Sequence, residues 1–420
     1  MPFESGIGSV SRHLIVTTGE RVVVDGMVAD RCVRPSTAQA IADVLAEAVE
    51  SEHAVTPVGG GTALGLGNLP DRVDSALSTR ALDAVLDYEP TDLVLSVGAG
   101  ARFGDVQRLL RSHGQTLPLD PPDGEDATIG GLIATARSGP LRRSSGTLRD
   151  YLVGMAVAHP SGTVTKCGGM VVKNVTGFDL PRLYHGSLGT LGVIVSANFK
   201  VLPLAAAEVT LVATAGDLDR AMAIADAWDR GTLQPAALEL AKESHGWIVA
   251  ARILGRQQTV TARAYDGREG ITDPIEEMSG DDSASWWTTY GQSQGSTVDP
   301  HEVIVRCGVR PKATGQLVRA LIATLVEPAA ELRSLRASVG RGIVHLRVLL
   351  PDGSPPSLLD LQRRLLDIAD HVTVLAAPPA WKRGIDVWGK EPDGFDVMQA
   401  VKQQFDPHRV LNPGRFIGRI

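Results

Sequence analysis

The chain has 420 residues, more than one hydrophobic core usually organises, so we expect about two or three domains. An apolar fraction of 43% and a charged fraction of 21% are typical of a folded globular protein and exclude a disordered chain. The formal net charge of −7 argues against a general nucleic-acid binder, because such proteins carry a basic face for the phosphates.

The N-terminus and the cysteines give no sign of export or of a metal site. Residues 1–10 lack a basic region followed by an apolar region, and no apolar run reaches the roughly 18 residues of a membrane span. Cys32, Cys167 and Cys307 lie far apart without Cys-x-x-Cys spacing, which argues against a built-in zinc site or iron–sulfur cluster. We expect a cytoplasmic protein with no metal, no membrane span of its own, and reduced, buried thiols.

The N-terminal region predicts a β–α–β arrangement. Val22–Val24 is a short strand candidate. Ser36 can cap a following helix with Gln39 as its capping-box partner, and apolar residues then repeat at helical spacing. A β-branched strand at Ala54–Val58 follows.

A cluster of glycines comes directly after that strand. Gly59, Gly60 and Gly61 have no Cβ, so the backbone can take positive φ and bring several N–H groups close to one anion. Thr62 adds a hydroxyl donor. Taken alone, this loop fits a phosphate cradle and an ordinary surface turn equally well.

A nicotinamide site is not indicated. The apolar run Leu93–Val97 ends in Gly98-Ala-Gly100, and the helix after it closes at His113-Gly114. The dinucleotide fingerprint needs a third glycine where Phe103 stands, and the earlier glycine loop has Leu64 at the corresponding place. No Walker lysine follows either loop.

Small residues recur in the next part of the chain. Ala127–Thr135 holds two adjacent glycines between β-branched residues, which predicts a backbone that another group approaches closely. Leu152–Ala158 and Thr163–Lys166 are typical of a β-hairpin. Glycines at every third place in Gly186–Gly192 do not suit a helix and let the chain lie flat against a ligand or strand.

Four sequence blocks, in this order, resemble the FAD-binding domain of the vanillyl-alcohol oxidase and p-cresol methylhydroxylase type. The blocks are Gly59–Thr62, Ala127–Gly131, Lys173-Asn174 with Gly177-Phe178-Asp179, and Gly186–Ile194. Within that superfamily, residues 138–143 with Arg149-Asp150, and the ending from Phe405 to Arg415, are most similar to the FAD-binding subunit of bacterial glycolate oxidases. The match covers residues 20–205 and roughly the last 25 residues.

The resemblance implies an α+β fold with a two-subdomain, PCMH-type FAD-binding domain and an α+β cap domain that contains an antiparallel sheet. We place the FAD-binding domain in residues 1–205, the cap (substrate) domain in 206–385, and a C-terminal segment that returns to the FAD domain in 386–420. The cap region contains strand candidates at 208–213, 236–240, 247–253, 303–309 and 343–350, and helix candidates at 218–228, 315–325 and 357–369.

The resemblance also implies FAD as the cofactor. The glycine loop would wrap the pyrophosphate, later segments would run along the ribityl chain and ring, a third group would hold the adenine, and Asn412 would lie near the ring. The first three groups are Gly59, Gly60, Gly61, Thr62, Ala63 and Leu64, then Pro121, Thr128, Gly130, Gly131, Ser138 and Gly139, then Gly192, Val193 and Ile194. The phosphate loop holds no His or Cys, so we expect non-covalent FAD; Cys167 and His185 are the nearest rivals and are expected to be structural.

Several other residues are expected to be structural. Asp266–Pro300 is a polar, acidic connection interrupted by Trp286-Trp287 and Tyr290, whose rings would roof the flavin pocket or fill a gap in the cap core; we favour the second role. Lys173 and Tyr184 lie in FAD-domain motifs, and we expect no catalytic role for them.

Catalytic residues are harder to assign. Oxidation of a 2-hydroxy acid needs a cation for the carboxylate and a base for the hydroxyl proton. The resemblance predicts a His-x-His pair in the catalytic sister subunit, but here His345 stands alone. It is a candidate base, with Arg347 or Arg341 as the carboxylate clamp, and alternation puts His345 and Arg347 on one strand face. A hydrogen-bonded core histidine is the competing interpretation.

Three functions fit the resemblance. The first is an FAD-bearing subunit of a glycolate oxidase-like complex that oxidises a small 2-hydroxy acid, such as glycolate or D-lactate, and passes electrons to an iron–sulfur partner beside a second flavoprotein subunit. Membrane association would then come through partners. The second is a non-catalytic assembly subunit, and the third is a stand-alone D-lactate-type dehydrogenase. The single histidine of residues 344–347 favours the first two.

Overall fold

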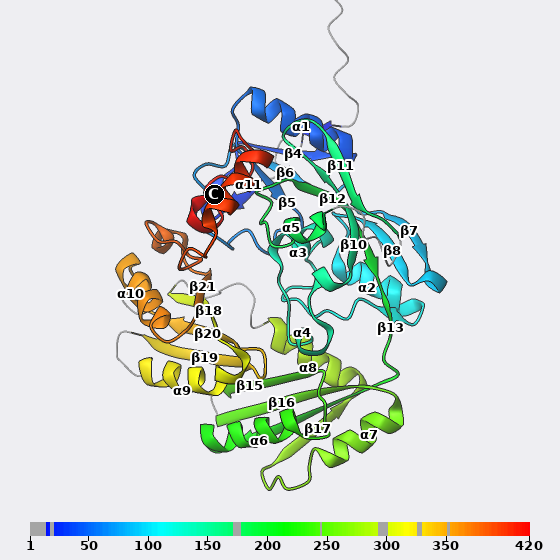
Figure 1. Ribbon diagram of the computed structural model, residues 1–420, viewed down its shortest axis with the longest axis vertical. Coiled ribbons are helices and arrows are strands. Elements are labelled where there is room, and N and C mark those ends of the chain that lie inside the picture. The colour runs from blue at the N-terminus through cyan, green and yellow to red at the C-terminus, as the bar shows by residue number, and fades with distance from the viewer. Residues whose placement is uncertain are drawn as a thin grey trace, which may run out of the picture.

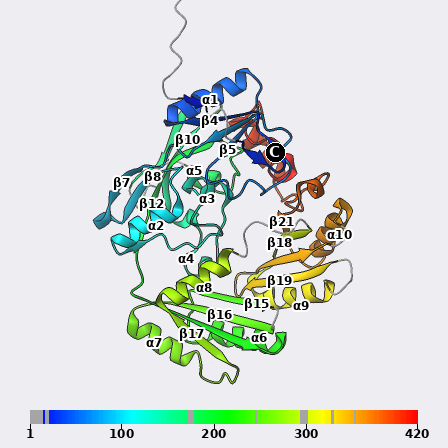
Figure 2. The same cartoon turned by 180° about the vertical axis from the view of Figure 1, so that it is seen from behind.

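A computed structural model describes residues 14–16, 21–170, 178–243, 246–292, 301–325, 330–350 and 353–420. The described chain forms two bodies, which Figures 1 and 2 show from opposite sides. One body combines the N-terminal half with the C-terminal segment, and the other is a cap built on one large sheet. Lys173, Asn174 and Gly177 of the predicted family blocks lie outside the described residues. Of the helices that are described, none is both long and apolar enough to cross a bilayer.

The first sheet carries the strand that enters the glycine loop. Its order is β1-β4-β6-β5, and β4, β6 and β5 are parallel. Helix α1 (Ala38–Glu50) buries Ile41 and Leu45 in the core below this sheet. The bounds are β1 Leu14–Val16, β4 Arg31–Pro35, β5 Val55–Val58 and β6 Ser75–Ser78, with a preceding hairpin of β2 Val23–Val24 and β3 Met27–Val28.

The predicted cap of this helix was wrong by one residue. Thr37, not Ser36, is the N-cap: its hydroxyl accepts a hydrogen bond from the Ala40 N–H at 3.1 Å. The side chain of Gln39 instead donates to the Asp43 carboxylate at 2.9 Å and to a distant carbonyl, so no capping box forms. Two hydroxyl residues stand side by side here, and the second has the extended backbone that an N-cap needs.

The second sheet is antiparallel and has the order β11-β10-β12-β8-β7. The predicted hairpin is present as β10 paired with β11. The close approach predicted for Ala127–Thr135 is also present, but on a helix: a Cβ at Gly130 of α3 would lie 2.9 Å from Ala99 Cβ. The bounds are β7 Val85–Glu89, β8 Val94–Gly98, β9 Gln115–Thr116, β10 Leu152–Ala158, β11 Val164–Gly168, β12 Val193–Lys200, β13 Leu202–Pro203, α2 Phe103–Ser112, α3 Ile129–Thr135, α4 Arg142–Ser145, α5 Leu180–Tyr184, and the 3₁₀ helices η1 Pro90–Asp92 and η2 Leu148–Asp150.

The cap is an antiparallel sheet of eight strands in the order β17-β14-β16-β15-β19-β20-β18-β21. Helices α6, α7, α9 and α10 pack on one face and form the main cap core. Figures 1 and 2 show α8 on the opposite face, toward the first body. The bounds are β14 Ala207–Ala215, β15 Ala237–Glu243, β16 Gly246–Gly255, β17 Ile275–Ser279, β18 Glu302–Gly308, β19 Glu331–Ser338, β20 Ile343–Leu349, β21 His371–Ala376, α6 Leu218–Arg230, α7 Gln257–Asp266, α8 Gly280–Gln292, α9 Thr314–Thr324, α10 Pro355–Leu366 and the 3₁₀ helix η3 Pro311–Ala313.

The stretch expected to be a polar connection between 266 and 300 contains two regular elements, β17 and α8. Trp287 and Tyr290 of α8 are buried against the sheet, and Trp286 packs beside them. Stacking of Trp286 on Tyr290 at 5.2 Å, with Trp287 edge-on to both, makes a compact aromatic cluster. These rings fill the space between α8 and the cap sheet, as the favoured interpretation held.

The C-terminal segment leaves the cap and returns to the first body. It passes through the 3₁₀ helix η4 (Pro379–Lys382) and α11 (Phe395–Phe405), and it ends in η5 (Ile417–Arg419). Val55 N–H donates to Val410 O at 2.7 Å, and Asn412 N–H donates to Val55 O at 3.0 Å. The red end of the chain therefore lies against the blue strands in Figure 1, beside the glycine loop.

Candidate active site

A cavity in the first body is lined by the glycine loop and by three other segments predicted to hold FAD. It includes all predicted cofactor residues except Pro121, Ser138 and Gly139. Ser138 and Gly139 line a second, adjoining cavity, and so does Pro122, the neighbour of Pro121. The predicted residues in the first cavity are Gly59, Gly60, Gly61, Thr62, Ala63, Leu64, Thr128, Gly130, Gly131, Gly192, Val193, Ile194 and Asn412.

The three loop glycines are needed for different reasons. A Cβ at Gly59 would lie 2.0 Å from Thr128 Oγ1, and one at Gly60 would lie 2.1 Å from the backbone oxygen of Asp126. Of the three, Gly61 alone has a positive φ, +82°. The expectation of positive φ for the run therefore holds at one position, and the other two glycines let the loop nest against the start of α3.

Two buried polar atoms show that the first cavity suits a ligand with hydrogen-bonding groups. Thr56 Oγ1 and Asn412 Oδ1 line it, and neither has a hydrogen-bond partner among the described residues. Asn412 is held in place because its amide donates to Leu188 O at 2.7 Å. Buried polar atoms without partners are costly, so a ligand that supplies donors stabilises the site. The glycine cradle and these atoms fit the hydroxyls, amides and pyrophosphate of FAD.

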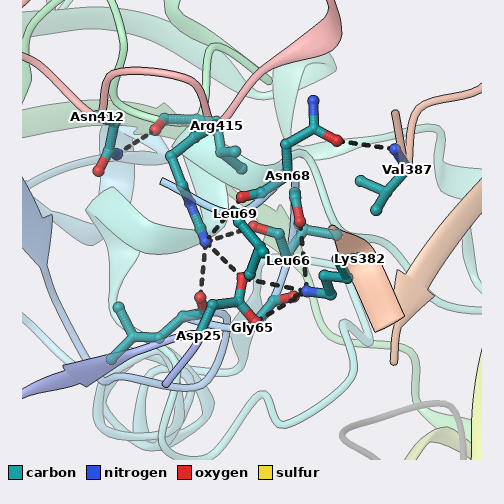
Figure 3. A network of polar contacts seen from close by, with 12 residues as sticks. Asp25, Gly65, Leu66, Asn68, Leu69, Lys382, Val387, Asn412 and Arg415 are labelled. Atoms are coloured by element: carbon teal, nitrogen blue, oxygen red, sulfur yellow. Dashed lines mark hydrogen bonds and ion pairs between the residues drawn. The ribbon is translucent and has the colours of Figure 1, made fainter. Parts of the chain in front are cut away.

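A buried cluster of charges holds the chain just after the glycine loop (Figure 3). The Arg415 guanidinium donates to Asp25 Oδ2 at 2.6 Å and to Leu64 O at 2.6 Å. The Lys382 ammonium donates to the other oxygen of Asp25 at 2.9 Å and to Gly65 O at 2.5 Å. Burial lowers the pKa of both cations, and the charge of Asp25 opposes that effect.

This cluster determines the direction in which the loop presents its polar groups. Carbonyl oxygens of residues 64–68 are bound by the two cations, with Arg415 and Lys382 at 3% and 1% exposure. Two cations and one carboxylate leave one unit of positive charge beneath the loop, which favours an anion such as pyrophosphate. Arg415 thus binds Asp25 and the carbonyls that follow the glycine loop, a role that the sequence did not reveal.

The second cavity runs from the first one to the cap. Both cavities are lined by Thr62, Ala63, Thr135, Arg137 and Leu188, so they adjoin each other. The cap side of the second cavity includes Arg306, Ser338, Arg341, Ile343 and His345. A flavin that follows the first cavity would end at this junction, beside the cap residues.

His345 lies in this second cavity. On β20 it pairs with Arg306 of β18 on one side and with Arg336 of β19 on the other. Burial, and then the positive charges of Arg306, Arg336 and Arg137, lower the pKa of His345 to about 3. The imidazole is therefore neutral at physiological pH, as a proton acceptor must be, but its protonation is disfavoured until a negative charge lies nearby.

Arg347 shares a strand with His345 but does not share its cavity. The Arg347 guanidinium binds both oxygens of Glu302, with Nε to Oε1 at 3.0 Å and Nη2 to Oε2 at 2.5 Å. Among the described residues that line the two cavities, Arg347 is absent, whereas Arg341 is present. Arg306 takes the place beside His345. Arg306 lies in the middle of the predicted strand 303–309, which is the feature of the sequence that could have pointed to it. Its position beside His345 also requires that this strand pair with the strand of His345.

Three residues expected to be structural, Cys167, Tyr184 and His185, lie outside both cavities, whereas Lys173 lies outside the described residues. The Cys167 thiol on β11 contacts Met155 O at 3.7 Å, and burial raises its pKa. Tyr184 is buried and packs edge-on against Phe405 with ring centroids 6.0 Å apart. His185 is half-buried, and burial lowers its pKa. Neither rival for a covalent flavin bond is among the described lining residues.

The comparisons with known proteins agree with this site. The family model for an FAD binding domain matches residues 29–168, and the model for the C-terminal domain of FAD linked oxidases matches residues 388–416. The solved structure of alkyldihydroxyacetonephosphate synthase has a similar fold, with a TM-score of 0.69, 15% identity, and coverage of 92% of this chain and 76% of that one.

Two of three relatives named for an oxidation of glycolate or D-lactate align with most of the chain, and the third aligns with about a third of it. Glycolate oxidase subunit GlcD of Bacillus subtilis (strain 168) is 24% identical over 93% of this chain and 89% of its own length. Glycolate oxidase subunit GlcE of Escherichia coli (strain K12) is 40% identical, over 32% of this chain and 39% of its own length. The mitochondrial D-lactate dehydrogenase [cytochrome] of Arabidopsis thaliana is 30% identical over 93% of this chain and 74% of its own length. The chain therefore belongs to the FAD-linked oxidase family, with a PCMH-type fold, and is an FAD-dependent oxidoreductase acting on CH–OH groups or a subunit of one.

Proposed function

We propose that this chain oxidises a small 2-hydroxy acid, such as glycolate or D-lactate, at the junction of the two cavities. The observation that carries the proposal is that His345 pairs with Arg306 across the sheet and that His345 and Arg306 line a cavity that adjoins the first one; burial and nearby arginines also lower the pKa of the imidazole. Relatives that align with most of the chain are named glycolate oxidase subunit and D-lactate dehydrogenase, which supports a 2-hydroxy acid as the substrate.

In the proposed reaction the substrate carboxylate binds Arg306, which has no carboxylate partner among the described residues. The carboxylate then offsets the positive charge that keeps His345 unprotonated, so the imidazole can take the hydroxyl proton. FAD, when bound, supplies the acceptor for the hydride that leaves the carbinol carbon. The C–H and O–H bonds break, a C=O bond forms, and the product is the 2-oxo acid. Arg306 holds the carboxylate throughout and fixes which face of the carbinol is presented.

FAD is proposed to be held without a covalent bond, since the glycine loop has no His or Cys. We further propose that the chain works beside a second flavoprotein subunit and an iron–sulfur subunit that receives the electrons. The support is that two relatives are named as subunits of glycolate oxidase. A stand-alone D-lactate dehydrogenase is the second candidate, favoured by the D-lactate dehydrogenases that align over more than nine-tenths of this chain.

The test is the visible spectrum of the purified chain before and after anaerobic addition of glycolate or D-lactate. Flavin bands that bleach would support chemistry in this chain, and His345→Asn and Arg306→Met should each slow the bleaching by about 100-fold or more. The matched control is His371→Asn, because His371 is exposed on β21 away from both cavities. Bands that persist with every 2-hydroxy acid, alone and with the other subunits present, would refute catalysis here and leave the assembly role.

A further inference from the structure

The second cavity has an excess of positive charge. Five arginines line it, and none of its described lining residues is an aspartate or glutamate. Two of the five are neutralised by ion pairs: Arg137 with Asp123 at 3.2 Å, and Arg143 with Asp229 at 2.5 Å. The other three lining arginines are Arg142, Arg306 and Arg341.

These three arginines bind neutral oxygens in the described structure. Arg142 donates to the Ser138 hydroxyl at 3.4 Å, Arg306 donates to Thr373 Oγ1 at 3.5 Å, and Arg341 donates to the Arg143 carbonyl. They are also close enough to affect one another: burial, and then the charge of Arg142, lowers the pKa of Arg306, while burial, and then the charge of Arg341, lowers the pKa of Arg142 against the opposing charge of Asp150. Such mutual repulsion is unfavourable unless an anionic ligand offsets it.

Arg142 and Arg341 face the cavity from different bodies, and the structure holds them together. Arg142 begins α4 in the FAD-binding body, and Arg341 lies in the turn between β19 and β20 of the cap, beside Gly340 and Gly342. Arg143, next to Arg142, donates to Val339 O at 2.7 Å and so fixes the cap turn against α4. A Cβ at Gly340, which has φ +74°, would lie 2.8 Å from the Arg143 guanidinium. The two guanidiniums are therefore positioned as a pair.

We infer that Arg142 and Arg341 form a second anion subsite, which takes an additional carboxylate of the substrate. The inference rests on the proposed function, in which Arg306 binds the carboxylate next to the carbinol. A monocarboxylate such as glycolate would leave the pair of arginines with no direct carboxylate partner among the described residues, where Asp150 acts on Arg142 through its charge but forms no ion pair with it. The substrate class is accordingly a 2-hydroxy dicarboxylic acid, whose second carboxylate bridges the FAD-binding body and the cap.

The test compares D-malate and D-2-hydroxyglutarate with D-lactate in anaerobic flavin bleaching of the holoprotein. The dicarboxylates should half-saturate at concentrations about tenfold or more below that of D-lactate, since each charge-assisted contact contributes at least this factor. Arg142→Met and Arg341→Met should each bring this ratio close to one. Arg149→Met is the matched control: it removes the same charge from an exposed residue that does not line the cavity, and the ratio should persist.

A second readout needs no turnover. Succinate and acetate cannot be oxidised at a carbinol, so their binding is followed by the shift they cause in the flavin spectrum. Tighter binding of succinate that depends on Arg142 and Arg341 supports the subsite even if no 2-hydroxy acid bleaches the flavin, in which case the proposed reaction alone fails. Bleaching by D-lactate with no preference for dicarboxylates or succinate, or with equal loss for both classes in the variants, would overturn the second subsite while leaving the reaction intact.

Discussion

Replacing Lys382 with methionine tests whether the buried charge cluster holds the phosphate loop. The ammonium of this residue donates to both oxygens of Asp25, at 2.9 and 3.1 Å, and to the carbonyls of Gly65 and Gly67. Methionine keeps an unbranched side chain of similar length but has no donor. The variant therefore leaves Asp25 with Arg415 as the remaining cation of the cluster and removes the donor to the two loop carbonyls.

The magnitude follows from burial. Removing one partner of a buried ion pair costs roughly 3–5 kcal/mol when the other charge is left unpaired. Asp25 keeps Arg415 here, but the carbonyls of Gly65 and Gly67 also lose their donor, at about 1–3 kcal/mol each, so a loss of similar size is expected. Lys382 and Asp25 have side-chain exposures of 1% and 3%, so this range applies without a discount for solvent screening. The free energy of unfolding should fall by about 3–5 kcal/mol, and FAD affinity should fall with it, since the loop loses the contacts that orient its N–H groups. Excess FAD should restore part of the stability, because it binds the folded state.

The assay is urea unfolding together with an FAD titration followed by flavin absorbance. Lys390→Met is the matched control, because Lys390 is exposed. Asp25→Asn provides a second check: alone it leaves two cations without a carboxylate, whereas with Lys382→Met it restores the net charge of the cluster. The double variant should therefore be less destabilised than the sum of the two single variants. Unfolding within about 0.5 kcal/mol of the Lys390→Met control, with unchanged FAD affinity, would refute the role of the cluster.

Three further changes probe other parts of the structure. Gly60→Val should abolish FAD retention while the cap stays folded, because the added Cβ would lie 2.1 Å from Asp126 O and displace the loop. Visible absorbance measures the retained FAD and circular dichroism the fold; normal FAD occupancy would contradict this role of Gly60. Burial raises the pKa of Glu239 from 4.5 to about 7, so this carboxyl stabilises the fold at low pH, and that stabilisation, roughly 3 kcal/mol, is lost as the pH rises through this window. Glu239→Gln should reduce the difference between the free energies of urea unfolding measured at about pH 5 and at about pH 7. An unchanged difference would exclude Glu239 as its source. Arg143→Met should lower the free energy of unfolding by roughly 2–3 kcal/mol, since its guanidinium joins α4 to Asp229 of the cap at 2.5 Å; a difference no larger than that of Arg149→Met would count against this link.

The sequence predicted part of the FAD-binding body, namely α1, α2, β2, β5, β8 and the hairpin of β10 and β11, because their signals are local; β4, β6, β7, β12 and the helices α3, α4, α5 and α11 were not predicted. The run that became β5 and the glycines after it lie within a few residues of each other, and the hairpin of β10 and β11 has a short turn. In the cap, the prediction missed β17, β19, β21, α7 and α8, and two of these show weak patterns. Strand β17 reads Ile-Glu-Glu-Met-Ser and is mostly exposed, and α8 contains few charges after its first turn. Its aromatic residues were noticed, but their helical spacing was not.

The residues predicted to bind the cofactor lie together around one cavity, whereas Arg347, predicted as a substrate clamp, does not line the cavity of His345, and the reason is related. The glycine requirement is a property of one loop and of the helix it touches, so a sequence block can reveal it. The placement of Arg306 beside His345 depends on β18 lying next to β20 in the sheet order, which no local pattern specifies. The ion pair of Arg347 with Glu302 depends on the same pairing. The alternation of side chains along the strand placed His345 and Arg347 on one face. It could not show that Arg347 is neutralised by Glu302.

The two cavities also differ in what maintains them, which predicts how they respond to change. The described residues that line the first cavity come from segments 56–64, 79, 127–137, 188–194 and 412–415, all in the FAD-binding body. Those of the second cavity come from both bodies, including Arg142 on one side and Arg306 on the other. Changes that loosen the cap should therefore weaken substrate binding while FAD remains bound, whereas changes in the Asp25 cluster should weaken both. Contacts such as that of Arg143 with Val339 hold the cap against the FAD-binding body. They therefore help to form the proposed substrate site, which residues of both bodies line.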